Sequence, residues 1–260
     1  AFNENSSSSV YQSRDVSGNN NQDFSQTHTT ETVNKNGATF IAGQGGSVTG
    51  DNAYDIQQIQ TISSSNDNGA SDSNIQQMQI TGKNNHNFVQ TLKSENMNDH
   101  QSTAEFTQTI TLSGPGETND NSHTQSAKTK DYLDHNSQVV RSQQFGIQDS
   151  SFIDSSQEYL SESTRDNGAS GIEFQDLNIQ HSKNNKPQQN MIMKQTNDGS
   201  TANQIGQALI MGNANDNIQV YQSVEDYDTN GAGVTDNSQQ RLAMTGNANI
   251  VNQQLITENN

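Results

Sequence analysis

The chain has 260 residues, and only 27% of them are hydrophobic, whereas ordinary globular domains contain about 45–50% apolar residues. Its formal net charge of −17 argues against nucleic acid and anionic membrane surfaces as partners, because no basic patch is available to neutralise phosphates. Cys is absent, which excludes disulfides and thiolate zinc sites, and no apolar run has the length of a membrane span.

A chain this polar cannot bury a thick apolar core, so its composition favours disorder unless some other interaction orders it. The chain starts at Ala1, with neither an initial Met nor an apolar signal segment. Such a start is typical of a mature secreted protein whose signal peptide has been removed, and equally of a shortened chain. We therefore expect an extracellular location, either secreted or at the cell surface.

Glutamine recurs along the chain at spacings that alternate between about 14 and about 18 residues. Two steps differ, and both contain a turn-like segment: Gln108 to Gln125 spans Gly-Pro-Gly at 114–116, and Gln207 to Gln222 spans Met-Gly-Asn at 211–213. The two spacings together predict a repeat of about 32 residues. An adjacent glutamine, Gln57 or Gln77, leaves the register open by one position at two places. The marker glutamines are Gln12, Gln26, Gln44, Gln58, Gln76, Gln90, Gln108, Gln125, Gln143, Gln157, Gln175, Gln189, Gln207, Gln222, Gln240 and Gln254.

Glycines mark the same period independently of the glutamines. One series follows a marker glutamine by five or six positions, and a second lies in Asn-Gly-Ala or a close variant of it. Asn-Gly and Asp-Gly favour turns because both residues tolerate a positive φ. The predicted turn glycines are Gly18, Gly50, Gly82, Gly114, Gly212 and Gly246 in the first series, and Gly37, Gly69, Gly168, Gly199 and Gly231 in the second.

The segments that follow the marker glutamines have the alternation of β-strands. The first two, after Gln12 and Gln26, are weak, because mostly polar residues occupy the alternating positions. Later segments place a glutamine and one or two apolar residues at i, i+2 and i+4, which is one face of a strand, and no helical stripe recurs. In chain order they are 90–92, 108–112, 143–147, 157–159, 175–179, 189–193, 207–211, 222–224, 240–244 and 254–256. The predicted core residues are Ile110, Leu112, Phe145, Ile147, Leu177, Ile179, Leu209, Met211, Leu242 and Met244.

One repeat therefore consists of a strand, a turn, a second strand and a second turn. Stacked repeats predict an all-β fold: a single-domain, two-sheet β-solenoid of cross-β type with eight units of about 32 residues. Stacked glutamines can hydrogen-bond amide to amide along the axis, which satisfies buried amides and orders a chain that lacks apolar volume. The units are 1–37, 38–69, 70–101, 102–136, 137–168, 169–199, 200–231 and 232–260.

The ends of such a stack expose unpaired strand edges, and proteins that stay monomeric usually cover them. No amphipathic capping helix is evident at either end, and the segment 240–256 is as regular as the central ones. We therefore predict that the chain is a structural subunit of an extracellular fibre. In this hypothesis the rung 240–256 of one copy pairs with the N-terminal rung of the next, which is a heterologous contact that grows into a filament. The alternative for the weaker N-terminal rung is a partial cap.

Two segments near the C-terminus, 212–219 (Gly-Asn-Ala-Asn-Asp-Asn-Ile-Gln) and 246–253 (Gly-Asn-Ala-Asn-Ile-Val-Asn-Gln), resemble the Gly-Asn-x-Ala…Gln stretch of bacterial curlin repeats. The resemblance implies a curli-like or Fap-like functional amyloid, a secreted subunit of biofilm fibres with stacked strand–turn–strand units and Gln/Asn ladders. It also implies polymerisation with copies of itself and dependence on a nucleator or a secretion pore. The repeat of this chain is longer than a curlin unit.

No catalytic or cofactor motif is present. There is no Gly-x-Ser-x-Gly elbow, and the glycines at 43–46 are too few and wrongly spaced for a phosphate loop. Asp- and Asn-rich turns offer the oxygens that Ca²⁺ prefers, but no EF-hand loop occurs, so we predict no enzyme activity and no cofactor, with Ca²⁺ as the open alternative. We interpret the dispersed histidines as solvent-exposed turn residues and predict no metal site. They are His28, His86, His100, His123, His135 and His181.

A second functional class stays open beside the fibre subunit. A monomeric, secreted β-solenoid could act as an adhesin or as a surface that binds glycans or ice. Only 5% of the residues are aromatic, which disfavours rows of exposed rings for polysaccharide binding. A carbohydrate-active enzyme of the parallel β-helix type is disfavoured, because the sequence has no convergent acidic cluster.

Overall fold

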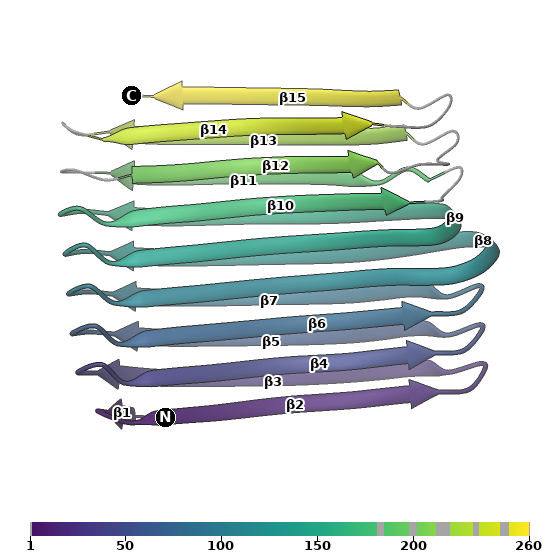
Figure 1. Ribbon diagram of the computed structural model, residues 1–260, viewed down its shortest axis with the longest axis horizontal. Helices are drawn as coiled ribbons and strands as arrows, with labels where there is room; N and C mark the ends of the chain where they lie inside the picture. Colours follow the sequence, from purple (N-terminus) through teal and green to yellow (C-terminus); the bar gives the residue numbers. More distant parts are fainter. Residues whose placement is uncertain are drawn as a thin grey trace.

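The computed structural model of the chain describes residues 2–180, 185–197, 202–211, 219–230, 234–244 and 250–259. Over these residues it has fifteen strands and no helix. The strands form two parallel layers that face each other along the whole stack (Figure 1). The predicted all-β, two-sheet β-solenoid is confirmed. None of the described segments is a helix long and apolar enough to cross a membrane.

The front sheet in Figure 1 contains one strand from each of eight successive coils, each paired in parallel with the next. Two of these strands, β8 and β9, continue through a corner into the other sheet. The front strands are β2 (Ser7–Ser17), β4 (Thr39–Thr49), β6 (Ser71–Thr81), the first part of β8 (Thr103–Leu133), the first part of β9 (Gln138–Arg165), β10 (Ser170–Gln180), β12 (Ala202–Met211) and β14 (Thr235–Met244).

The back sheet repeats this arrangement, with parallel pairing throughout. At its first edge the short β1 pairs only with the last part of β3. The back strands are β1 (Phe2–Glu4), β3 (Gln22–Lys35), β5 (Tyr54–Asn66), β7 (His86–Asn98), the second parts of β8 and β9, β11 (Gln188–Asn197), β13 (Gln219–Asn230) and β15 (Ile250–Asn259).

Strand register follows the sequence period. Gln44 pairs with Gln76, and Gln58 with Gln90, each 32 residues later. Between β7 and β8 the offset grows to 35 residues, because Gln90 pairs with Gln125. The extra residues lie where the β8–β9 register shifts after Ser113. The insertion expected at 114–116 therefore enlarges one corner and leaves the stacking of the strands intact.

The first corner connects each front strand to its back strand, and its glycines lie almost on top of one another. The φ angles are +104° at Gly18, +142° at Gly50 and +136° at Gly82, and an L-residue rarely adopts such values. A Cβ atom on Gly82 would lie 2.0 Å from the carbonyl oxygen of Gly50, and a Cβ atom on Gly50 would lie equally close to that of Gly18. These glycines are needed both for conformation and for space. Gly114 lies at the next such corner, where β8 bends into the other sheet as one continuous strand instead of ending in a separate turn.

The second corner connects each back strand to the next coil. Gly37, Gly69 and Gly168 have φ angles of +74°, +72° and +84°, as the Asn-Gly-Ala pattern predicts. A Cβ atom added at Gly37 or Gly69 would have no atom within 4 Å, so here only the backbone conformation requires glycine. Four further predicted turn glycines lie outside the described residues: Gly199, Gly212, Gly231 and Gly246.

The two kinds of corner make a testable pair. We expect Gly37→Ala to lower the free energy of unfolding by about 1–2 kcal/mol, the cost of a left-handed L-residue. Gly82→Ala should cost about 1–3 kcal/mol more, because its Cβ atom would overlap a main-chain oxygen that cannot rotate away. Urea unfolding of both variants measures the difference. Equal costs would show that the coils can separate at the first corner.

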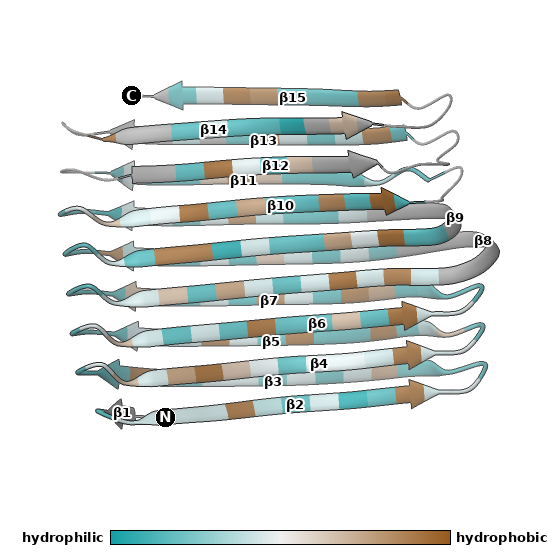
Figure 2. Cartoon of the chain, viewed as in Figure 1, coloured by the Kyte–Doolittle hydropathy of each residue, from teal (hydrophilic) through white to brown (hydrophobic). Residues whose placement is uncertain are grey.

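The apolar core is thin and divided into two clusters by a polar centre. One cluster lies near the first corner and contains predicted core residues of the front sheet together with Phe24, Ile56 and Phe88 of the back sheet. In Figure 2 it is marked by the brown residues near the ends of the front strands. The other cluster lies toward the second corner and includes Phe106, Val139 and Met191.

The predicted core residues of the central coils are buried, with at most 3% of their surface exposed: Ile110, Leu112, Phe145, Ile147, Leu177 and Ile179. In the later coils, Leu209 and Leu242 continue the backbone register of Leu177, and Met211 and Met244 continue that of Ile179. The side chains of these four later residues lie outside the described part of the structure.

Candidate functional site: the glutamine columns and the end coils

Each sheet carries an inward column of glutamines along the stacking axis. In the front column, the Nε2 atoms from Gln76 to Gln240 each donate to the Oε1 atom one coil earlier, at 2.8–3.2 Å. In the back column, the Nε2 atoms from Gln58 to Gln253 do the same at 2.5–3.2 Å. The front column is Gln12, Gln44, Gln76, Gln108, Gln143, Gln175, Gln207 and Gln240, and the back column is Gln26, Gln58, Gln90, Gln125, Gln157, Gln189, Gln222 and Gln253.

The same amides also join the two sheets. Gln108 Nε2 donates to the main-chain oxygens of Gln90 and Ser126, both at 3.2 Å, while Gln90 Nε2 donates to the main-chain oxygen of Thr109 at 3.3 Å. An amide group has two hydrogens, so one serves the axial ladder and the other crosses the interior. Sequence reasoning predicts only the axial bond, because spacing does not say which carbonyl faces the column from the opposite sheet.

Fifteen of the sixteen marker glutamines lie in the columns, and the last is displaced by one position. Gln222 pairs with Gln253, an offset of 31 residues, so Gln253 carries the final rung and the prediction of Gln254 is wrong. Gln254 is exposed and accepts a hydrogen bond from Tyr221 Oη at 3.2 Å. The sequence left the register open at two places, where glutamines are adjacent. Gln57 and Gln77 are exposed on the outer faces, so Gln58 and Gln76 are the column members.

An asparagine ladder runs parallel to the glutamine columns near the second corner. Asn34 Nδ2 donates to Asn66 Oδ1, and Asn66 Nδ2 to Asn98 Oδ1, both at 2.8 Å. All three side chains are buried. Their spacing of 32 residues is a usable signal in the sequence, but Asn is so abundant that this series does not stand out.

In the coils that follow the asparagine ladder, charged side chains occupy the interior near the second corner. Arg165 Nη2 donates to Glu173 Oε1 at 2.7 Å, and Arg165 Nη1 donates to Gln195 Oε1 at 2.6 Å. Arg141 pairs with Asp131 and lies 3.7 Å from Glu173 Oε1. Both arginines are fully buried, and the four charged groups sum to zero. No repeated spacing marks this cluster, so sequence reasoning misses it.

Two of the histidines occupy the interior, which corrects their interpretation as exposed turn residues. His28 and His123 are buried on strands β3 and β8. Burial lowers the pKa of His123 to about 3, so its ring is neutral. Burial likewise raises the pKa of Asp72 to about 6, against opposing hydrogen bonds from Ser64 and Asn74. At both residues burial without an ion pair shifts the pKa toward the uncharged form.

The two end coils leave the interior open. Val10 of β2 is 50% exposed, although Ala42 at the same inward position one coil later is fully buried. At the other end, Leu255 of β15 is 44% exposed, whereas its neighbour Val224 is fully buried. Within the residues described, β2 pairs only with β4, β14 only with β12, and β15 only with β13. Each end therefore presents a free strand edge beside uncovered apolar side chains.

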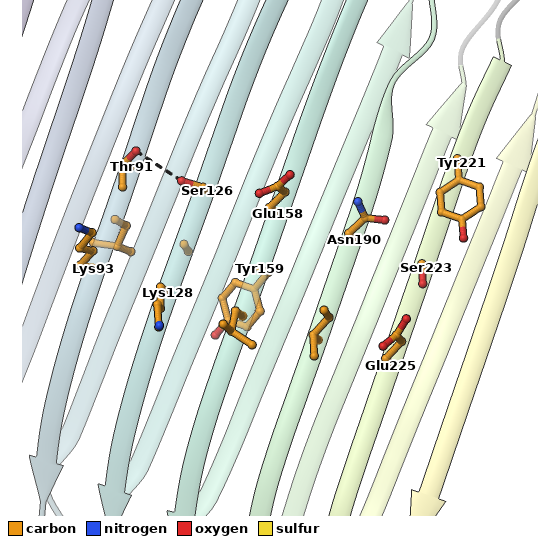
Figure 3. Close-up of a pocket in the computed structure, with 14 residues that line it drawn as sticks. Thr91, Lys93, Ser126, Lys128, Glu158, Tyr159, Asn190, Tyr221, Ser223 and Glu225 are labelled. Atoms are coloured by element: carbon orange, nitrogen blue, oxygen red, sulfur yellow. Dashed lines mark hydrogen bonds between the residues drawn. The ribbon is translucent and has the colours of Figure 1, made fainter.

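The outer face of the back sheet carries a shallow groove of about 530 Å³ across β7, β8, β9, β11 and β13 (Figure 3). Lys93 and Lys128 line one end, Leu160 and Ile192 the middle, and Glu225 the other end. In the register of the sheet these side chains form one row across successive coils. The row changes from positive through apolar to negative side chains. Such a surface suits a ligand that has both charged and apolar groups.

Comparison with protein-family models, curated proteins and solved structures finds no match to this chain. Most of the two segments that resemble curlin repeats, 212–219 and 246–253, lies outside the described residues. Their last glutamines are described: Gln219 opens β13, and Gln253 ends the back column.

Proposed function

We propose that this chain is a structural subunit of an extracellular, self-assembling fibre in which copies stack end to end. It would be a functional amyloid of curli-like or Fap-like type, with a longer repeat. The partner is a second copy of the chain, and a nucleator or secretion pore would serve export and assembly. The resemblance of 212–219 and 246–253 to curlin repeats supports this type.

The observation that carries the proposal is the exposure of inward-facing side chains at both ends. A β-solenoid that stays monomeric normally covers its terminal coils, since an open edge and an open core both promote association. Here Val10 and Leu255 belong to inward positions that are fully buried one coil further in. Stacking of a second copy would bury both residues. It would also pair the free edge of β14 with that of β2, and the free edge of β15 with that of β3.

The register between successive coils of one chain predicts how two copies of the chain would pair. Continuing the front column would place Gln240 of one copy next to Gln12 of the following copy, and continuing the back column would place Gln253 next to Gln26. The edge of β3 is paired by β1 only from Val33 to Lys35, so most of that edge is free to receive β15. Because the two contacting surfaces differ, the contact repeats without closing and yields a filament.

A charged residue at the end of the front column tests this assembly. Gln240 is half-buried, and its Nε2 donates to Gln207 Oε1 at 3.2 Å, a bond that a lysine can replace within the monomer. In a fibre, Gln240→Lys would bury an ammonium group against the next subunit. We therefore expect electron microscopy and thioflavin fluorescence to show loss of fibre growth, with circular dichroism unchanged.

The matched control is Gln239→Lys, one residue earlier and exposed on the outer face. This variant adds the same charge and should form fibres as the unmodified chain does. The proposal fails if the unmodified protein stays monodisperse and thioflavin-negative at high concentration. It also fails if Gln240→Lys elongates as fast as the control.

The alternative is a monomeric, secreted adhesin or surface-binding protein, and two observations favour it. Arg14 lies at an inward position of the first coil, with its guanidinium carbon 4.4 Å from the centre of the Phe24 ring, and a charge at an edge opposes stacking. The groove around Leu160 and Ile192 offers a binding surface. Persistently monomeric protein that binds a glycan or ice surface would select this function.

A further inference from the structure

The second corner brings together two histidines from successive coils, His100 and His135. At this turn position the other described coils carry asparagine, namely Asn36, Asn68 and Asn167. All five residues have positive φ angles between 47° and 54°. In these described coils the residue at this position therefore has the same φ angle, and only its side chain changes. The two imidazole rings stack in parallel, with centroids 4.6 Å apart and an interplanar angle of 2°.

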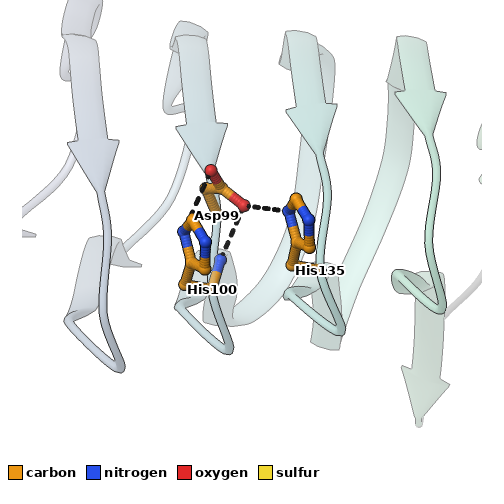
Figure 4. Close-up of side chains that lie close together, drawn as sticks. All are labelled: Asp99, His100 and His135. Atoms are coloured by element: carbon orange, nitrogen blue, oxygen red, sulfur yellow. Dashed lines mark hydrogen bonds and ion pairs between the residues drawn. The ribbon is translucent and has the colours of Figure 1, made fainter.

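Carboxylates alternate with these rings along the corner. Asp99 lies between the two histidines, with its oxygens 3.1 Å from His100 Nδ1 and 2.7 Å from His135 Nδ1 (Figure 4). Asp67 lies 2.9 Å from His100 Nδ1, and Asp134 lies 3.2 Å from His135 Nδ1. Both Nδ1 atoms thus point at one shared carboxylate, with a further carboxylate beside each ring.

We propose that Asp99, His100 and His135 form a site for one divalent transition-metal ion, of which Zn²⁺ is the representative, held between two successive coils. One ligand atom from each residue lies within 4.8 Å of the other two. Ligands of a tetrahedral zinc ion lie about 2.0–2.2 Å from the metal, and so about 3.3 Å from one another. Each of the three side chains is about half exposed, so they can draw together around an ion without moving the backbone.

The ligand set selects the class of metal. Two imidazole nitrogens suit Zn²⁺, Cu²⁺ or Ni²⁺, whereas Ca²⁺ and Mg²⁺ require oxygen ligands almost exclusively. When the ion binds, each ring offers the Nδ1 lone pair and keeps its proton on Nε2, so the ion replaces the hydrogen bonds to Asp99. Water or a neighbouring carboxylate, Asp67 or Asp134, would complete the coordination. Metal bound here would add a second link between two turns that a main-chain hydrogen bond, from Gln101 N to the oxygen of His135 at 2.9 Å, already joins.

The sequence alone predicts no metal site, because no two histidines have the spacing of metal ligands on one helix or one strand. In a solenoid the relevant spacing is one coil, which is lengthened here by the insertion at 114–116. The site lies in the middle of the stack and does not involve the end coils. It is therefore independent of the proposed fibre assembly, and either proposal can fail alone.

Calorimetric titration of the full chain with zinc chloride at mildly alkaline pH tests the site. We expect one Zn²⁺ per chain and a higher unfolding temperature in its presence. His100→Asn and His135→Asn each introduce the residue that other coils carry with the same φ, so both variants should fold. Each should weaken zinc binding by at least about tenfold and remove the thermal shift.

The control is His86→Asn, which removes an imidazole at the start of β7 and should leave zinc binding unchanged. Imidazole NMR provides an independent measurement, in which zinc should shift the Nδ1 signals of His100 and His135 together. The proposal is wrong if the unmodified chain binds no zinc. It is also wrong if the two corner variants bind zinc as tightly as the His86 control does.

Discussion

Gln108→Leu is expected to lower the free energy of unfolding by about 4 kcal/mol, because several buried polar groups lose their partners at once. The side chain keeps roughly its size but loses both polar atoms. Gln76 Oε1 then lacks its donor, and the main-chain oxygens of Gln90 and Ser126 lose a donor. Gln143 Nε2 loses its axial acceptor and keeps only the main-chain oxygen of Glu158. A buried group left unpaired costs about 1–3 kcal/mol. The total loss in the free energy of unfolding should therefore exceed the loss that a typical surface substitution causes.

Two further variants separate the column from general effects of burial. Thr109→Val changes the neighbouring residue on the outer face and should alter stability by less than about 0.5 kcal/mol. Gln12→Leu changes the exposed first member of the same column and should be similarly mild in the monomer. Urea unfolding measures all three. If Gln108→Leu matched Thr109→Val, the axial amide ladder would not be a main source of stability.

Glu173→Gln is expected to lower the free energy of unfolding by about 3–5 kcal/mol, because it leaves a buried positive charge without compensation. Arg141 and Arg165 are then balanced only by Asp131, in an interior closed to solvent. Gly171 supports the same cluster: a Cβ atom there would lie 2.2 Å from Arg165 Nη2. Gly171→Ala should therefore also destabilise the chain, by displacing the guanidinium from Glu173.

The comparison for this prediction is Glu158→Gln, which removes a carboxylate exposed on the outer face of β9 and should have little effect. The double variant Arg165→Met with Glu173→Leu removes the pair together and should recover most of the stability, because the desolvation cost disappears with the charges. Thermal unfolding distinguishes these cases. A Glu173→Gln protein as stable as the Glu158→Gln protein would show that water reaches the cluster.

The repeat period, the alternation of inward and outward residues, and the column positions of fifteen marker glutamines could be read from the sequence. They are local properties, since strand alternation and turn chemistry depend on neighbouring residues. The error at the last rung has the same origin. Gln253 and Gln254 are chemically identical neighbours, and only the pairing of β13 with β15 distinguishes them.

Repetition alone was therefore enough to determine the fold class of this protein, because identical side chains at a constant interval stack only when the chain coils at that interval. Tertiary structure decided everything that depends on the contents of one particular coil. The Arg141–Asp131 and Arg165–Glu173 pairs, the carbonyl groups facing the amides, and the stacked rings of His100 and His135 all join residues with no common pattern. Such contacts depend on side-chain directions across the interior or along a corner, which spacing along the chain does not specify.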